Sequence, residues 1–111
     1  MIKIANAFSL NMLKHEGPVG LIVEPINTSQ AQKLLTERFT SYVGHEDTAR
    51  ILSSLLGVEI QYNRASATLE PGDVLLVAQY RGPRLPEGAT ELPEGAEIRF
   101  YVVTLTDISY D

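Results

Sequence analysis

His45 lies at the start of a predicted helix, in the segment VGHEDTARILSSLLG of residues 43–57. Apolar residues recur at steps of three and four from Ile51 to Leu56, which predicts a helix with one buried face, and Gly57 is a typical helix stop. Steps of four, three and four connect His45, Ala49, Leu52 and Leu56. The imidazole is therefore expected along the core-facing edge of the helix.

A histidine at the start of a helix can serve phosphate chemistry. The free N–H groups and partial positive charge there favour a bound phosphate, and the imidazole can donate a proton to a leaving oxygen. The helix end favours neutral imidazole whereas a bound phosphate favours imidazolium, so ligand binding would load the acid. The alternative is an ordinary helix start, in which Glu46 and Asp47 complement the helix dipole.

Other catalytic classes have little support in the sequence. The chain has no cysteine, and its two histidines, His15 and His45, do not lie in a metal-binding pattern. No Walker loop, G-x-S-x-G elbow or G-x-G-x-x-G stretch occurs. We therefore predict neither a metal nor a cofactor, and interpret His15 as a solvated loop residue.

Polar and aromatic side chains gather where predicted strands end. Arginines there can hold phosphates, amides can hydrogen-bond base edges and tyrosines can stack on bases. Taken alone, Asn6, Ser9 and Asn11 are better explained as capping residues, and the others also have explanations as solvated surface residues. The set consists of Asn6, Ser9, Asn11, Tyr62, Asn63, Arg64, Gln79, Tyr80, Arg81 and Arg84.

Alternating strands and helices must position these groups. The patterns predict strands and helices in turn: strands over 2–6, 17–26, 58–62, 73–80 and 97–108, a helical turn over 7–14, and helices over 27–39 and from His45. Thr28 or Ser29 is the expected cap of the first helix, which directs Leu34, Leu35 and Phe39 to the core. The interleaving predicts one α/β domain over residues 1–111, a mixed β-sheet of about five strands with flanking helices.

A long loop is predicted over residues 82–95, between two core strands. It contains a local repeat, because LPEGATE at 85–91 is followed by LPEGAEI at 92–98. The Pro-Glu-Gly steps predict two successive turns. Loops of this length in small domains are often lids or binding loops.

Composition limits the classes of partner. The chain has 111 residues, 44% of them apolar, and a net charge of −5. It has neither a secretion signal nor a run of about 18 to 20 apolar residues, so we expect a soluble, cytoplasmic protein without membrane contact. The acidic balance argues against bulk DNA or RNA binding but leaves room for one small anion in a basic pocket.

Five stretches together resemble a known family. They are ANAFSLNML at 5–13, VGHEDTARILSSLLG at 43–57, NR at 63–64, AQ at 78–79 and RLPEG at 84–88. Together they resemble the viral ring nuclease family, the type III anti-CRISPR proteins that degrade cyclic tetra-adenylate, and its bacterial relatives. The match runs over nearly the whole chain, and the first stretch and the Gly-His step are its specific parts.

The resemblance implies a homodimeric, metal-independent phosphodiesterase. In this family a ribose 2'-hydroxyl attacks the adjacent phosphate, which leaves a 2',3'-cyclic phosphate and yields linear di-adenylates. His45 matches the catalytic histidine, expected to be the general acid, and Glu87 matches a loop carboxylate near the centre of the closed site. The expected ligand-binding residues are Asn6, Ser9, Asn11, Asp47, Thr48, Arg64, Gln79 and Arg84. Asp47 departs from the family, which often has serine or threonine there.

Two other functions remain open at the level of sequence. A binding module could sequester the ring without cutting it, using the same loop and arginines. A small dimeric protein could instead regulate a partner through the apolar faces of its helices. Binding of cyclic oligoadenylates would exclude the regulatory protein. Product formation would then separate the nuclease from the sequestering module.

Overall fold

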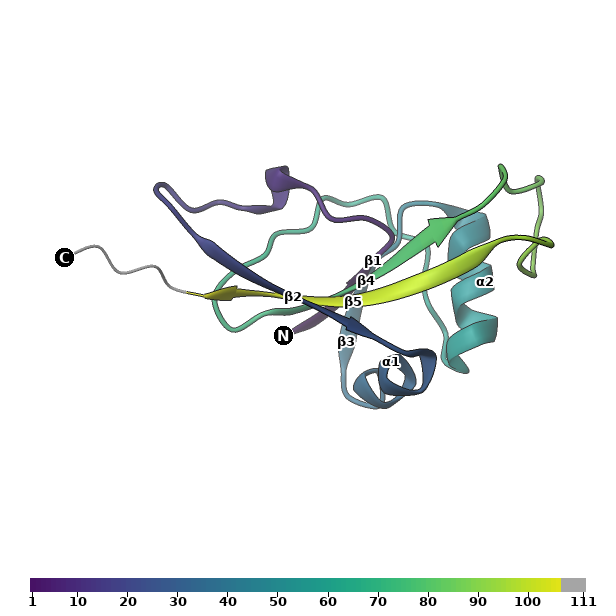
Figure 1. The fold of residues 1–111 in the computed structure, drawn as a ribbon, viewed down its shortest axis with the longest axis horizontal. Coiled ribbons are helices and arrows are strands. Elements are labelled where there is room, and N and C mark those ends of the chain that lie inside the picture. Colours follow the sequence, from purple (N-terminus) through teal and green to yellow (C-terminus); the bar gives the residue numbers. More distant parts are fainter. Residues whose placement is uncertain (107–111) are drawn as a thin grey trace.

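A mixed five-stranded sheet forms the centre of the protein. The computed structural model describes residues 1–106. The strands are β1 (Ile2–Ala5), β2 (Gly20–Ile26), β3 (Phe39–Tyr42), β4 (Val74–Arg81) and β5 (Glu97–Thr106). They lie in the order β2-β5-β4-β1-β3 (Figure 1). The helices are α1 (Thr28–Leu34), α2 (Glu46–Leu56) and a short 3-10 turn, η1 (Leu10–Met12).

Three parallel strands carry the part of the fold that matters for the site. β1 pairs with β3 on one side and with β4 on the other, and both pairs are parallel. Ala5 at the end of β1 is level with Tyr42 of β3 and Val77 of β4. β5 pairs antiparallel with β4, and β2 pairs antiparallel with β5 to complete the sheet. The carboxyl ends of β1, β3 and β4 therefore meet at one edge of the sheet.

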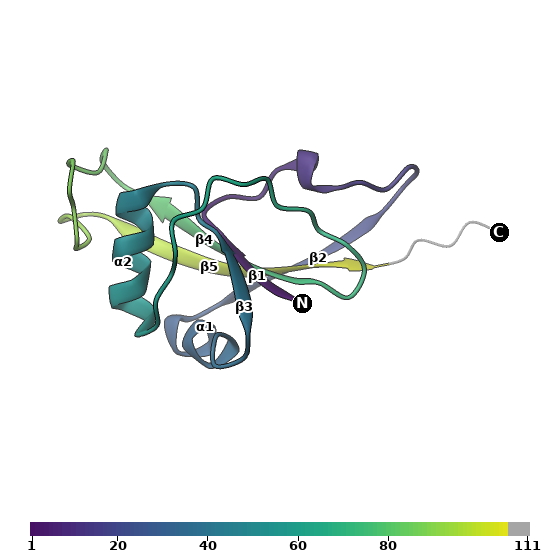
Figure 2. The ribbon, with the colours of Figure 1, turned by 180° about the vertical axis from the view of Figure 1, so that it is seen from behind.

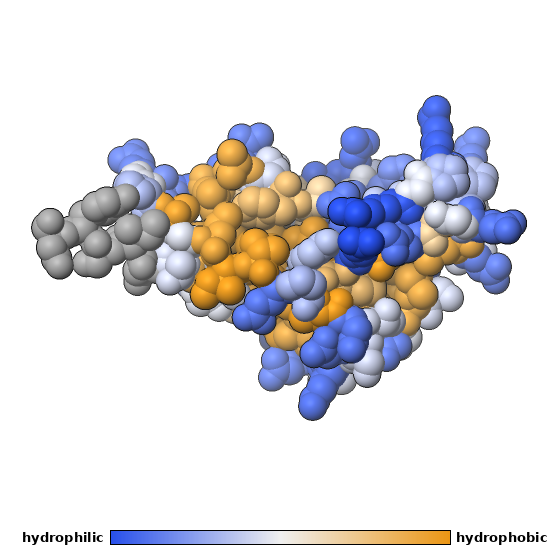
Figure 3. Space-filling model, viewed as in Figure 1, coloured by the Kyte–Doolittle hydropathy of each residue, from blue (hydrophilic) through white to orange (hydrophobic). Residues whose placement is uncertain are grey.

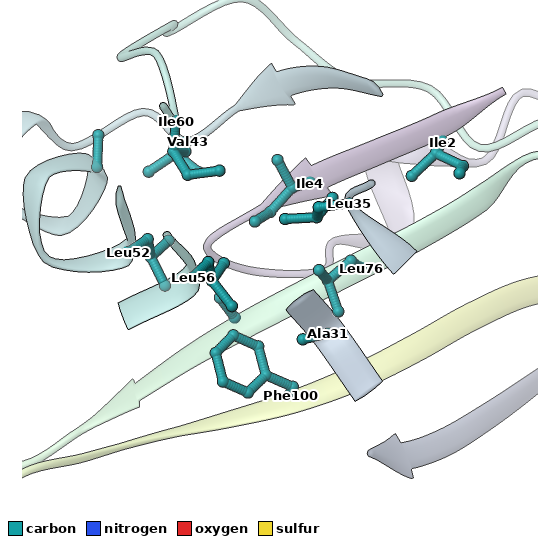
Figure 4. Close-up of a cluster of buried hydrophobic side chains, with 12 residues drawn as sticks. Ile2, Ile4, Ala31, Leu35, Val43, Leu52, Leu56, Ile60, Leu76 and Phe100 are labelled. Atoms are coloured by element: carbon teal, nitrogen blue, oxygen red, sulfur yellow. The ribbon is translucent and has the colours of Figure 1, made fainter. Parts of the chain in front are cut away.

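Both helices lie on the same face of the sheet. α1 and α2 contact each other, and Figures 1 and 2 both show α1 beside the lower end of α2. Leu52 and Leu56 of α2 point toward Leu76 of β4 and Phe100 of β5 in the close-up of this core (Figure 4). All four side chains are buried. Burying one apolar stripe of α2 against the strands fixes the direction of the helix and hence the position of its first turn.

Irregular segments cover the opposite face. Leu69 from the loop before β4 packs with Leu75, Val77 and Val103 in a second apolar cluster, and Phe8 and Met12 complete its rim. The backbone N–H of Leu69 donates to the carbonyl of Met12 at 2.8 Å. The segments 6–19 and 63–73, which lie far apart in the sequence, are thus joined to each other over this face.

The predicted elements agree with the structure except in three places. The helix predicted over 27–39 ends at Leu34, and its expected last residue, Phe39, instead begins β3, a strand that was not predicted and that pairs with β1 at the sheet edge. Residues 58–62 form no strand beyond a single bridge between Val43 and Tyr62. Their backbone is held instead by α2, since Ile60 N–H donates to the Ser53 hydroxyl at 2.9 Å.

The third difference concerns the cap of α1. The cap is Asn27 and not Thr28 or Ser29. Its side chain accepts from the Gln30 N–H at 2.8 Å, and the Gln30 side chain accepts from the Asn27 N–H at 2.9 Å. This reciprocal capping box satisfies two N–H groups at once. Of the predicted strand 97–108, residues 107 and 108 lie outside the described residues.

An apolar strip remains exposed on β2. This strand lies at the edge of the sheet, and its Ile22 and Val23 side chains are about half exposed, at 47% and 55%. The space-filling view shows apolar residues gathered over β2 and β5 (Figure 3). Pro25 within β2 fits an edge position, because proline cannot donate to a neighbouring strand.

No helix within residues 1–106 combines the length and the apolar character that crossing a bilayer requires.

Candidate functional site at the carboxyl edge of the parallel strands

A polar residue lies within three positions of the end of each of the three parallel strands. Asn6 follows β1, His45 follows β3 after two residues, and Gln79 lies near the end of β4. In sheets of this type, ligands bind outside the carboxyl ends of the strands, where loops diverge. Figure 1 shows the arrowhead of β4 at the same end of the molecule as the first turn of α2. The register thus brings together residues far apart in the sequence.

His45 is the cap residue of α2 but does not cap it. Its backbone is extended, with φ −133° and ψ 121°, and its side chain makes no hydrogen bond to the first turn. Glu46 and Asp47 follow in that turn. The exposed imidazole and the N–H groups of the first turn are therefore both available to a ligand at this end of α2. The outward position differs from the core-facing edge expected from the periodicity, because the residue precedes the first helical turn.

A cavity of about 890 Å³ opens beside this imidazole. Its wall is formed by the carboxyl ends of β1 and β4, the first turn of α2 and the loop after β4. The lining residues are Asn6, Ala7, His45, Asp47, Thr48, Gln79, Tyr80, Arg84, Leu85, Pro86 and Glu87. Seven of the ten residues expected from the sequence lie together here.

A second cavity, of about 450 Å³, adjoins the first on the other side of the imidazole. His45, Asp47 and Glu87 line both cavities. The second cavity adds Arg64 from the segment after α2, together with Arg50 and Tyr62. A β-carbon built on Gly44 would lie 3.8 Å from the Cα atom of Arg64, so this arginine sits beside the chain that leads into α2.

A third cavity, of about 380 Å³, extends the site along β1. Asn6 and Ala7 line both the first and the third cavity, and Ser9 and Asn11 line only the third. The Ser9 hydroxyl accepts from the Asn11 N–H at 3.2 Å and so caps η1. Ser9 and Asn11, both expected to bind the ligand, thus lie next to the imidazole cavity and not inside it.

Two asparagines hold the segment that carries His45. The Asn6 side-chain oxygen accepts from the Gly44 N–H at 3.1 Å, which ties the end of β1 to the residue before the histidine. The Asn63 side chain donates to the Ser41 carbonyl at 2.8 Å, and the backbone N–H of Asn63 donates to the Val43 carbonyl at 2.9 Å. These bonds fix the approach to α2 from both sides. The imidazole therefore projects from an ordered backbone.

The loop after β4 forms the outer wall of the site. Its repeat folds into the two predicted turns, because the Ala89 and Ala96 N–H groups donate to the Pro86 and Pro93 carbonyls. The Tyr80 hydroxyl donates to the Pro83 carbonyl and holds the start of the loop. The first turn presents Glu87 to the imidazole side of the site. The loop is thus built from short hydrogen-bonded turns between residues 82 and 96.

Sequence reasoning overlooked one charged residue of this site. The Arg50 guanidinium donates to Asp47 and also to the Glu46 carboxylate at 3.2 Å, so both acids of the first turn have the same partner. The spacing of three and four residues along a helix was the available signal. The apolar wall made by Leu85 and Pro86 was also missed, because it depends on how the loop folds back.

The remaining predictions concern groups outside these cavities. His15 is exposed and lines none of the three, as expected for a loop histidine. Within residues 1–106, no three side chains of the metal-binding types His, Cys, Asp and Glu come close enough together to hold an ion. The site is therefore described by its histidine, arginines, carboxylates and amides.

Comparison with known proteins assigns the fold to a family of small α/β proteins that has viral members. A family model described as STIV B116-like matches residues 2–102, and the chain belongs to this family. The structure of B116 from Sulfolobus turreted icosahedral virus superposes with a TM-score of 0.79 and 28% identity, covering 93% of this chain and 97% of that one. "Uncharacterized protein 26" of Sulfolobus islandicus filamentous virus (isolate Iceland/Hveragerdi) is 38% identical over 89 residues, which are 79% of this chain and 74% of that protein.

Proposed function

We propose that this protein is a ring nuclease that cleaves cyclic tetra-adenylate without a metal ion. The observation that carries the proposal is the convergence of His45, Gln79, Arg84 and Glu87 around one cavity at the first turn of α2. The cavity combines a possible acid, cationic and amide groups for phosphate, and free N–H groups at a helix start. Acting in the cytoplasm of the host, such an enzyme would switch off type III CRISPR signalling.

The reaction needs little from the protein beyond position and a proton. The ribose 2'-oxygen attacks the adjacent phosphorus, and the bond from phosphorus to the 5'-oxygen breaks. Imidazolium at His45 gives its proton to that departing oxygen, while the 2'-hydroxyl proton leaves to a base or water. One strand end then carries a 2',3'-cyclic phosphate and the other a free 5'-hydroxyl. Because the nucleophile belongs to the substrate, the site needs no serine or cysteine.

The charged groups have separate roles in this scheme. Arg84 in the first cavity and Arg64 in the second can stabilise the charge that builds up on the phosphorane oxygens. Glu87 borders both cavities beside the imidazole, where a carboxylate can accept a hydrogen bond from the attacking hydroxyl or orient the histidine. Closure of loop 82–95 over the ring would expel water. The adjoining cavity lined by Asn6, Ser9 and Asn11 would receive the adjacent nucleotide.

Two copies are proposed to share one ring. A two-fold dimer would place one His45 at each of two opposite phosphodiesters, so that the products are two linear di-adenylates. Sedimentation of the purified chain with and without the ring measures the oligomeric state directly.

The decisive experiment incubates the purified protein with cyclic tetra-adenylate in excess chelator and separates the products by chromatography. We expect linear di-adenylates with 2',3'-cyclic phosphate ends. His45→Ala should abolish cleavage while binding persists, and His15→Ala, a change of the other exposed histidine, should leave both unchanged. Tight stoichiometric binding without product would identify a sequestering module instead. Failure to bind any cyclic oligoadenylate would overturn both.

A further inference from the structure

The carboxylate of Asp47 stands in an unfavourable place for a site that takes an anion. It follows His45 by two residues, lines both cavities beside the imidazole, and its side chain is only 14% exposed. A carboxylate held near a phosphate repels it, and partial burial weakens the screening by solvent. Something must therefore offset this charge if the site binds a polyanion.

Arg50 provides that offset. Its Nη2 group donates to Asp47 Oδ1, and its Nη1 group donates to Glu46 Oε1 at 3.2 Å. Among the residues that the structure describes, Arg50 is the only ion-pair partner of Asp47. The two acids differ, since the Glu46 side chain is 67% exposed and that of Asp47 is largely covered. Both acids line the second cavity, but only Asp47 also lines the first, and solvent screens its covered charge less.

We propose that Arg50 is a positioning residue for anion binding: it neutralises Asp47 and holds that carboxylate turned along α2, away from the phosphate position at the first turn. Arg50 lines the second cavity from the side of α2 and does not line the first, where Arg84 and Gln79 lie. Its two terminal nitrogens are already paired with the carboxylates of Glu46 and Asp47, so it acts through Asp47 and not as a phosphate ligand. This inference rests on the proposed function of the same site.

A double-mutant cycle tests the role of Arg50. Arg50→Gln should weaken binding of cyclic tetra-adenylate about tenfold and raise KM to a similar extent with kcat little changed, because a repulsive charge is released into the ground state and transition state alike. Asp47→Asn should bind as well as the parent or better. The double variant Asp47→Asn, Arg50→Gln should return to within about twofold of the parent, because there is then no charge to offset. Arg50→Lys should retain most of the affinity.

A matched control and a second probe keep the outcomes distinct. Glu46→Gln removes the exposed partner of the same arginine and should change affinity far less than Arg50→Gln does, because solvent screens a charge that is 67% exposed. Equal losses for Arg50→Gln in both Asp47 backgrounds would overturn the proposal and make Arg50 a direct ligand; no loss in either would also overturn it. Parallel calorimetry with inorganic pyrophosphate repeats the cycle without the ring. If the parent binds pyrophosphate but not the ring, the ring nuclease proposal fails while the cycle still decides the role of Arg50; if it binds neither, both proposals fail.

Discussion

The two ends of the parallel strands use charge in opposite ways. At the amino end, Lys3 of β1 and Asp73 before β4 form an ion pair with Nζ and Oδ2 2.8 Å apart, and their side chains are only 5% and 10% exposed. Lys3 also donates to the Thr68 carbonyl at 2.6 Å, and Asp73 accepts from the Glu70 N–H at 3.0 Å. At the carboxyl end, the charged groups surround open cavities. The sheet is thus closed at one end and accessible at the other.

The difference indicates which charges the fold requires and which it leaves free. A buried pair must remain complete, because removal of one partner leaves an unpaired charge in a medium of low polarity. Arg64, Arg84 and Glu87 are exposed, so their individual contributions to stability are small. They are therefore free to serve a ligand. The contrast predicts that changes at the carboxyl end alter activity and changes at the amino end alter stability.

The largest expected effect is on turnover at the carboxyl end. His45→Ala should lower kcat for cyclic tetra-adenylate by about 10²–10⁴-fold, the usual contribution of a general acid. Its urea midpoint should stay close to that of the parent, because the exposed imidazole makes no capping hydrogen bond. Single-turnover kinetics and urea denaturation measure the two quantities. A large loss of stability would mean that the histidine is structural.

The largest stability effect is expected at the amino end. Asp73→Asn should lower the free energy of unfolding by about 3–5 kcal/mol, because it leaves the buried ammonium of Lys3 without its partner. The double variant Lys3→Met, Asp73→Leu should lose much less, since neither charge remains. Urea titrations of both variants test this, with activity per folded molecule expected to be unchanged. Equal losses in the two variants would contradict the contrast between the ends.

The contribution of the Lys3–Asp73 ion pair to stability should be lost at low pH. Burial alone raises the pKa of Asp73, but hydrogen bonds from Lys3 and from the Glu70 N–H, together with the charges of Lys3 and the terminal amine, outweigh it and leave the pKa below its usual value. A carboxylate with a lowered folded pKa stabilises the protein above its unfolded pKa of about 3.9 and loses this contribution as the pH falls further. The stability difference between the parent and Asp73→Asn should therefore shrink below about pH 4. A difference that stays constant to pH 2 would contradict this.

The sequence predicted local elements well and three-dimensional neighbours less well. The period of α2, its Gly57 stop and the two turns of the loop depend on nearby residues, and all three predictions are confirmed. The strand at 39–42 was missed because it is held by pairing with β1 from the other end of the chain. The buried ion pair of Lys3 and Asp73 was missed for the same reason, because its members lie seventy positions apart in the sequence.

The site itself divides in the same way. The helix start at His45 was visible from periodicity, but its convergence with Asn6, Gln79 and Glu87 depends on strand order and on the fold of the loop. The resemblance to a known family named these positions, which composition and spacing alone did not bring together. Arg50 could have been found from spacing alone, yet its importance becomes apparent only when Asp47 is seen to line the cavities.

The smallest predicted effect compares the starts of the two helices. Asn27 caps α1 through a reciprocal box, whereas His45 leaves the first turn of α2 without a side-chain cap. Asn27→Ala should therefore cost about 1 kcal/mol of stability, and His45→Asn should add up to about 1 kcal/mol because an amide oxygen can accept from the first turn. Thermal melts of the two variants beside the parent measure both signs. A gain in stability together with lost turnover would show that the histidine is kept at this helix start for its chemistry and at the expense of a better cap; a loss of stability in His45→Asn would mean that the imidazole already supports the helix.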